Sequence, residues 1–177
     1  IVNPCMETER EFKEQISRQK KDKEKALLRC HGTAKTKDGT KIQVKANIGC
    51  FEDAESAVAN GADGIGLYRL EQLYLSRTKP LSEQGLLENI ERTLSTMEEK
   101  TVTIRLLDAG ADKDIPFLNL PAENNPFLGR RGVRLLLEYP DLTKLQLKVM
   151  SKLSQNYNIR ILVPMVTVPE DMKQIRE

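Results

Sequence analysis

The stretch that decides the fold is Gly61-Ala-Asp-Gly-Ile-Gly-Leu-Tyr-Arg-Leu-Glu71, and a second stretch, Val102-Thr-Ile-Arg-Leu-Leu-Asp108, repeats its pattern. Each is a short apolar run that ends in an arginine with a carboxylate shortly after it. In α/β proteins ligands collect at the carboxyl ends of parallel strands, so an arginine at the end of a strand points into such a site. We therefore expect Arg69 and Arg105 to lie side by side at one rim of a sheet.

The residue type at these two positions indicates the chemistry. Arginine suits an anion site because its planar guanidinium pairs bidentately with carboxylate or phosphate and stays charged at any working pH. One arginine after a strand is adequately explained by the solvent at strand ends. Two arginines on consecutive strand units, each followed by an acid, favour an anion-binding site.

The hydrophobic pattern predicts alternating strands and helices from Gly32 onward. Asp38-Gly39 predicts a primed hairpin turn before the first strand, and Ser82 and Asp141 are the expected caps of two helices. Expected strands cover residues 41–48, 64–68, 101–107 and 160–166, and expected helices cover residues 51–60, 82–97, 130–138 and 142–154, with another after Pro169. Residues 108–129 form a long connection of the kind that is usually functional or disordered.

This order of elements indicates an α/β fold with about four strand–helix units. A (β/α)8 barrel needs eight such units and typically about 250 residues. Two architectures therefore fit: an open doubly wound sheet, or a piece of a barrel. Because the sequence stops inside a predicted helix, we expect a partial TIM-type (β/α)8 barrel, with about the first four β/α units in residues 31–177.

Residues 1–30 are expected to form a separate helical connector between the domain and something upstream. The charges of residues 7–29 support a helix, since acids come early and bases come late, which complements the helix dipole. The apolar positions form a stripe too thin for a core helix. We therefore expect a long, largely exposed helix in front of the domain.

The composition argues against several classes of function. With 39% hydrophobic residues the chain is an ordinary globular protein, and no apolar run approaches the ~18 residues of a transmembrane helix. No signal region is evident, so we expect a cytoplasmic protein without a membrane partner. A net charge of +2 and the absence of tryptophan argue against nucleic acid. Cys5, Cys30 and Cys50 are expected to be reduced thiols, and His31 a loop histidine.

Three ordered segments resemble a known family: Gly64-Ile-Gly-Leu-Tyr-Arg-Leu-Glu71, Thr103-Ile-Arg-Leu-Leu-Asp-Ala-Gly-Ala-Asp-Lys113 and Asn125-Pro-Phe-Leu-Gly-Arg-Arg131. They are similar to the phosphoenolpyruvate-binding barrel of Enzyme I, the phosphoenolpyruvate-protein phosphotransferase of the sugar phosphotransferase system. The resemblance covers essentially the whole chain. Residues 1–29 resemble the family's helical connector, and the remainder resembles the first half of its barrel.

The resemblance implies that the phosphoryl group of phosphoenolpyruvate passes, with Mg2+, to a histidine of a mobile domain. From there it passes to a histidine phosphocarrier protein for sugar uptake. The resemblance assigns substrate binding to Arg69, Arg105 and Arg131, and a supporting role to Glu71, Asp108, Asp112, Lys113 and Asn125. It places the phosphohistidine upstream, and the Mg2+ carboxylates and a proton-donating cysteine beyond Glu177. We therefore expect no catalytic residue or metal ligand in this chain, a piece that is inactive alone, and a homodimeric full protein.

Two other functions fit the same residues. A phosphoenolpyruvate synthase or pyruvate phosphate dikinase shares this type of barrel, although the sequence of the motif Leu67-Tyr-Arg-Leu-Glu71 favours Enzyme I. A non-catalytic regulatory or scaffolding module would keep the half barrel for protein contacts. A further alternative is a parallel α/β domain whose arginines lie at the surface without a binding role. The three ordered motifs are the main argument against it.

Overall fold

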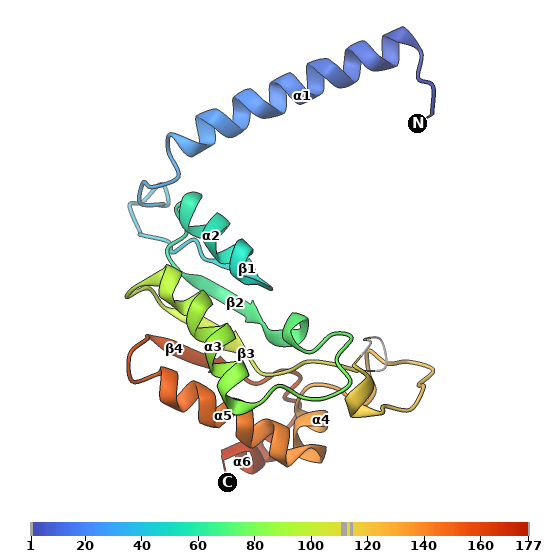
Figure 1. Cartoon of the computed structure of the whole chain (residues 1–177). Helices are drawn as coiled ribbons and strands as arrows, with labels where there is room; N and C mark the ends of the chain where they lie inside the picture. The colour runs from blue at the N-terminus through green and yellow to red at the C-terminus, as the bar shows by residue number, and fades with distance from the viewer. Residues whose placement is uncertain (1, 111–112, 114, 177) are drawn as a thin grey trace.

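The fold is a four-stranded parallel sheet with helices on one face, and the computed structural model describes residues 2–110, 113 and 115–176. The strand order is β1-β2-β3-β4, and all three pairings are parallel (Figure 1). The strands are β1 (Ala46–Ile48), β2 (Ile65–Arg69), β3 (Val102–Arg105) and β4 (Ile159–Leu162). The predicted α/β class is confirmed, and neighbouring strands follow one another in the chain as in the first half of a barrel.

The helices α2 (Phe51–Ala59), α3 (Glu83–Leu94) and α5 (Pro140–Leu153) cover one face of this sheet (Figure 1). Val102 and Ile104 of β3 are buried in the core beneath them, whereas Thr103 and Arg105 alternate onto the other face. The shorter elements are η1 (Leu70–Leu73), η2 (Ser95–Met97), η3 (Pro116–Leu118), α4 (Val133–Glu138) and α6 (Pro169–Arg176). The polar face of the sheet is thus the one that the helices leave uncovered.

Local capping chemistry sets the helix boundaries. The Ser82 hydroxyl accepts a hydrogen bond from the Gly85 N–H at 3.1 Å, so the predicted cap of α3 is confirmed. The predicted cap at Asp141 is wrong, because α5 begins one residue earlier at Pro140 and Asp141 lies in its first turn. Proline suits that first position, since its fixed φ matches the helix and its missing N–H has no partner there.

The predicted hairpin before β1 is present, but its turn is not the predicted primed turn. Within residues 36–40 only Gly39 has a positive φ, at 88°, and its N–H donates to the Thr36 carbonyl. A two-residue primed turn needs positive φ at both central residues, so this is a three-residue loop ending in a left-handed glycine. Lys35 and Lys41 form an isolated antiparallel bridge, and Ile42 and Val44 are exposed. The predicted strand at residues 41–48 is therefore wrong before Ala46, where β1 begins.

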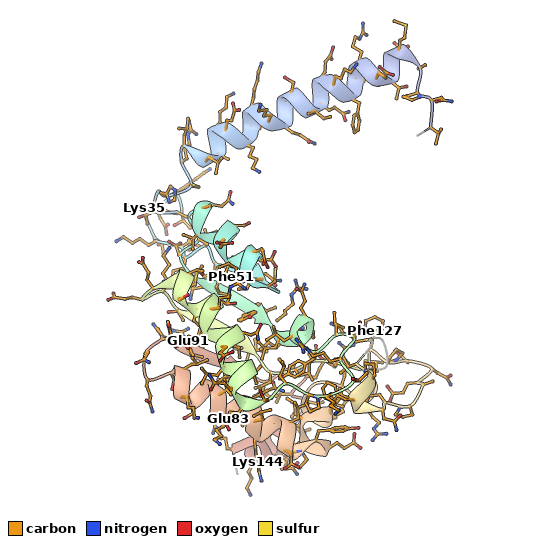
Figure 2. The ribbon with its side chains drawn as sticks, in the orientation of Figure 1. Lys35, Phe51, Glu83, Glu91, Phe127 and Lys144 are labelled. Atoms are coloured by element: carbon orange, nitrogen blue, oxygen red, sulfur yellow. The ribbon has the colours of Figure 1, made fainter. Side chains whose placement is uncertain are left out.

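The long helix α1 (Met6–Leu27) extends away from the body of the molecule (Figure 1). None of its residues is buried, and its thin apolar stripe, which includes Phe12, Ile16 and Leu27, is exposed. The side-chain view shows the same isolation along the length of the helix (Figure 2). Its exposed character agrees with the sequence, while its role as a connector stays a prediction. No helix in the described part of the chain is both long and apolar enough to span a membrane.

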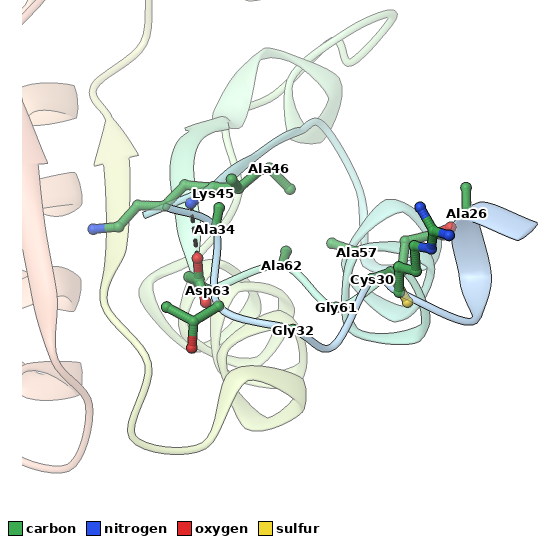
Figure 3. A pocket seen from close by; sticks show the side chains of 14 residues that line it. Ala26, Cys30, Gly32, Ala34, Lys45, Ala46, Ala57, Gly61, Ala62 and Asp63 are labelled. Carbon is green, nitrogen blue, oxygen red and sulfur yellow. Dashed lines mark hydrogen bonds between the residues drawn. The ribbon is translucent and has the colours of Figure 1, made fainter. Parts of the chain in front are cut away.

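The segment that follows α1 joins the body beside a pocket of about 670 Å3, lined by the end of α1, the start of β1 and the loop after α2 (Figure 3). At this junction Gly61 ends α2, as predicted, with a left-handed φ of 73°. A Cβ placed on Gly61 would lie 2.2 Å from the Cys30 carbonyl oxygen. Gly61 is therefore required both by its backbone conformation and by the close approach of the Cys30 backbone.

Two glycine variants separate these requirements. Gly39 also has a positive φ, of 88°, but a Cβ there would meet no atom within 4 Å in the described structure. We expect Gly39→Ala to lower the free energy of unfolding by about 1 kcal/mol, from backbone strain alone. Gly61→Ala is expected to lower it by about 3 kcal/mol, because the clash with Cys30 adds to the strain. Urea unfolding followed by circular dichroism measures both, and equal losses would refute the close contact.

Candidate functional site

Arg69 and Arg105 lie at the same rim of the sheet. Arg69 is the last residue of β2, Arg105 is the last residue of β3, and the two are register partners. Paired residues of neighbouring strands point to the same face of a sheet, and the residues before them, Tyr68 and Ile104, are buried on the helix side. Both arginines therefore belong to the uncovered face, at the carboxyl ends of their strands.

Arg105 is held by two carboxylates. Its Nη2 donates to Oε1 of Glu71 at 2.7 Å, and its Nη1 lies 3.3 Å from Oδ2 of Asp108. Glu71 is 3% exposed and Asp108 is 7% exposed, so both charges are largely removed from water. Glu71 Oε1 also accepts the backbone N–H of Asp108 at 3.1 Å. Glu71 thus fixes both the guanidinium and the residue that carries the second carboxylate.

Arg131 joins this network through Asp108. Its Nε donates to Asp108 Oδ1 at 3.0 Å, and its side chain is buried. Each oxygen of Asp108 therefore faces a different guanidinium. The Phe127 ring lies 5.5 Å from the guanidinium carbon of Arg131, within the range of a cation–π contact. Phe127 is labelled in Figure 2 beyond the carboxyl end of β2, which is the end of the sheet that carries the arginines.

Arg69 differs from the other two arginines. It is exposed, and within the described part of the chain its guanidinium has no hydrogen-bond or ion-pair partner. Among the described residues, this region brings the guanidinium groups of Arg69, Arg105 and Arg131 together with the carboxylates of Glu71 and Asp108, and these five side chains carry a net positive charge. A site with this balance, and with one arginine uncommitted, is suited to binding an anion.

The other residues predicted to support the site, Asn125, Lys113 and Asp112, are not seen to join the arginine network. The Asn125 carbonyl accepts the N–H of Leu128 at 3.2 Å, which closes a turn, and its side chain is exposed. The N–H of Lys113 donates to the Gly110 carbonyl at 3.0 Å. Among the described residues neither is seen in contact with the three arginines. Asp112 lies outside the described residues.

Sequence reasoning missed two buried polar residues near this region. Gln146, on α5, is fully buried and accepts the backbone N–H of Leu107 at 3.0 Å. Tyr74 follows η1 and is also fully buried, and burial raises the pKa of its hydroxyl. The signal for Gln146 was present in the sequence as a polar residue within the apolar stripe of a helix, between Leu142 and Val149. Nothing in the spacing indicated which strand end it would contact.

The cluster does not resemble a metal site. Among the described residues no group of three or more histidine, cysteine, aspartate or glutamate side chains is gathered as metal ligands. Glu71 and Asp108 are both engaged with guanidinium groups, whose positive charge opposes a cation. The residues described here therefore do not fit Mg2+, whose ligands the resemblance places on later strands.

Comparison with known proteins gives the family. The family model described as "PEP-utilising enzyme, PEP-binding domain" matches residues 22–177, which include β1 to β4 and the arginine cluster. This chain belongs to that PEP-binding domain family. The match extends over most of the chain, including all the residues discussed at the rim.

The chain is similar along its whole length to parts of several longer proteins. Proteins called "Phosphoenolpyruvate-protein phosphotransferase" from Geobacillus stearothermophilus and Borreliella burgdorferi are 37% and 40% identical, each over 176 residues and 99% of this chain. "Multiphosphoryl transfer protein 2" from Escherichia coli is 33% identical over 177 residues, all of this chain. The chain spans 30%, 31% and 21% of the lengths of these three relatives, respectively.

Two glutamates of the PEP-binding domain test the importance of burial in the arginine network. Glu71→Ala should lower the free energy of unfolding by about 3–5 kcal/mol, because Arg105 and the Asp108 N–H lose a buried partner. Glu83 provides the control, since it also has two partners, Lys148 at 2.7 Å and Lys152 at 2.6 Å, but lies at the surface. Glu83→Ala should cost far less. Urea unfolding compares the two variants, and similar losses would contradict a structural role for the buried network.

Proposed function

We propose that this chain is the phosphoenolpyruvate-binding part of a phosphoenolpyruvate-protein phosphotransferase, and that Arg69, Arg105 and Arg131 bind the substrate. The observation that carries the proposal is the register pairing of Arg69 with Arg105 at the carboxyl ends of β2 and β3. The family match and the names of the relatives support it. Phosphoenolpyruvate carries a phosphate and a carboxylate close together, and a group of guanidiniums suits both.

Arg105 retains hydrogen-bonding capacity for such a ligand. A guanidinium has five N–H donors, and at Arg105 one donates to Glu71 and another faces Asp108. Its Nε is buried without a hydrogen-bond partner in the described structure. The second N–H of each Nη nitrogen is therefore the donor left for substrate oxygens after the carboxylates have fixed the orientation of the group.

The division of roles among the arginines follows from their surroundings. Arg69, exposed and without a partner among the described residues, is free to contact the incoming anion. Arg105 and Arg131 are already oriented by Glu71 and Asp108, so they reorganise little when the substrate binds. Phosphoryl transfer depends chiefly on positioning and on stabilising the charge of the equatorial oxygens, and fixed guanidiniums provide both.

The finer features of the whole protein belong to the same proposal. We infer that the sheet is the first half of a (β/α)8 barrel and that residues 1–30 connect it to a phosphohistidine domain. The phosphoryl group would pass to that histidine and then to a histidine phosphocarrier protein. Mg2+, held by ligands beyond Glu177, would neutralise phosphate charge. A homodimer and a cytoplasmic location complete the proposal, on the basis of the resemblance.

Arg69→Ala in the full-length protein is the cleanest test of this function. Loss of a bidentate contact to a bound anion is expected to cost about 2–5 kcal/mol, which corresponds to a fall in kcat/KM of roughly 30-fold to several thousandfold. Thermal stability should hardly change, because the side chain is exposed. The assay is pyruvate formation from phosphoenolpyruvate with the carrier protein as acceptor. Near-normal turnover would contradict the proposal.

Arg18 provides a control for that experiment. It is also an exposed arginine, but it belongs to α1, which extends away from the sheet and its rim (Figure 1). Arg18→Ala should leave turnover close to that of the unmodified protein. Arg105→Ala is less informative, because it would leave the carboxylates of Glu71 and Asp108 buried without their partner. Replacing the carrier protein with a nucleotide as acceptor distinguishes this function from that of a dikinase.

A further inference from the structure

Leu107 lies between the two residues that anchor the ion-pair network, Arg105 and Asp108. The hydrogen bonds of the sheet reach only as far as Leu106, whose N–H donates to the Leu162 carbonyl at 3.0 Å. On the other side β2 ends at Arg69, opposite Arg105, and the chain then turns into η1. The sheet therefore offers no strand residue opposite Leu107, although Leu107 is fully buried. A buried N–H in this position needs an acceptor from elsewhere.

Gln146 supplies that acceptor from the helix layer. Its Oε1 accepts the Leu107 N–H at 3.0 Å. The backbone donor determines which atom of the amide faces it, since only the oxygen can accept. Gln146 comes from α5, which covers the face of the sheet opposite the arginines (Figure 1). The contact therefore supports the rim segment from behind.

The Nε2 group of the Gln146 amide shows that placing glutamine here lowers stability. The side chain is 0% exposed and belongs to a buried stripe of α5 that includes Val149 and Met150. Its Nε2 has no hydrogen-bond partner in the described structure. Burying an unpaired amide group is unfavourable, and an apolar side chain would pack in this stripe without that penalty. The bond to Leu107 is what an apolar residue could not provide.

Two side chains thus hold consecutive backbone amides of the rim segment. Gln146 accepts the N–H of Leu107 from the helix layer, and Glu71 accepts the N–H of Asp108 from η1. We propose that Gln146 is a positioning residue for the phosphoenolpyruvate site, acting through the Leu107 backbone to place Arg105 and Asp108. The inference rests on the proposed function, because it assigns these two residues to the substrate site.

The test compares three variants of the full-length protein. Gln146→Met keeps the size of the side chain but removes the acceptor, and it should lower kcat/KM for phosphoenolpyruvate at least about tenfold, since small displacements of binding groups have large effects. Gln146→Glu keeps an acceptor oxygen in either protonation state and should restore most of the activity. Thr143→Val removes another buried polar group of α5, whose hydroxyl donates, among the described residues, to the carbonyls of Leu136 and Tyr139 and not to the rim segment. It should lower the melting temperature without a comparable loss of kcat/KM.

The outcomes separate the inference from the proposed function. If Arg69→Ala, assayed in parallel, loses activity while Gln146→Met keeps it, the positioning role of Gln146 is wrong and the function stands. If Arg69→Ala itself retains activity, the proposed function fails. A loss of kcat/KM in Thr143→Val equal to that in Gln146→Met would also overturn the inference, since any polar change in α5 would then have the same effect.

Hydrogen exchange provides a readout that does not depend on activity. The Leu107 amide of the unmodified protein should exchange slowly, and in Gln146→Met the Leu107 and Asp108 amides should exchange faster while those of α2 are unchanged. If Gln146→Met does not fold, the exchange rate of the Leu107 amide in the unmodified protein still tests the inference. Exchange of the Leu107 amide as fast as that of exposed amides would show that Gln146 does not hold this segment.

Discussion

The buried contact between Glu71 and Arg105 is the interaction on which the organisation of the rim depends. One oxygen of Glu71 receives both the Arg105 Nη2 and the Asp108 N–H. Asp108, placed in this way, contacts both Arg105 and Arg131. Removing water from such charges is costly, and apolar residues of similar size often stabilise a protein as well or better. Stability alone therefore does not explain the network, and the proposed function gives it a role in orienting the arginines for an anion.

The sheet and its helices divide the work of building this site. Parallel strands bring Arg69 and Arg105 to one rim, because each crossover helix returns the chain to the same end of the sheet. The helices bury the apolar face and also reach the rim through Gln146. The large pocket beside the end of α1 lies at the other end of the sheet, near the starts of β1 and β2. Its lining has mostly small or apolar side chains and lacks the cluster of charged groups found at the rim (Figure 3).

The sequence predicted what depends on local pattern. The Ser82 cap, the Gly61 helix stop and the apolar stripe of α3 are all set by residues within a few positions of one another. The order of strands followed from the alternation of helices and strands, and the shared rim of the arginines followed from parallel pairing. The predicted turn type at Asp38-Gly39 and the predicted cap of α5 were wrong. In each case two local geometries that differ by one residue fit the same sequence.

What the sequence did not predict depends on contacts between distant segments. The Glu71–Arg105 bond joins residues 34 positions apart, and the Gln146–Leu107 bond joins residues 39 positions apart. The length of strand β1 was also overestimated. Alternation of apolar and polar residues does not show whether other elements cover the apolar side, and Ile42 and Val44 are exposed. Sequence reasoning identified the arginines, but only the fold shows that carboxylates hold two of them in place.

An experimental structure of the full-length protein with bound phosphoenolpyruvate tests the central claim most directly. The account predicts that one substrate molecule contacts the guanidinium groups of both Arg69 and Arg105, while Glu71 keeps its contact with Arg105. A substrate bound away from these two arginines, or one that Arg105 reaches only by leaving Glu71, would contradict it.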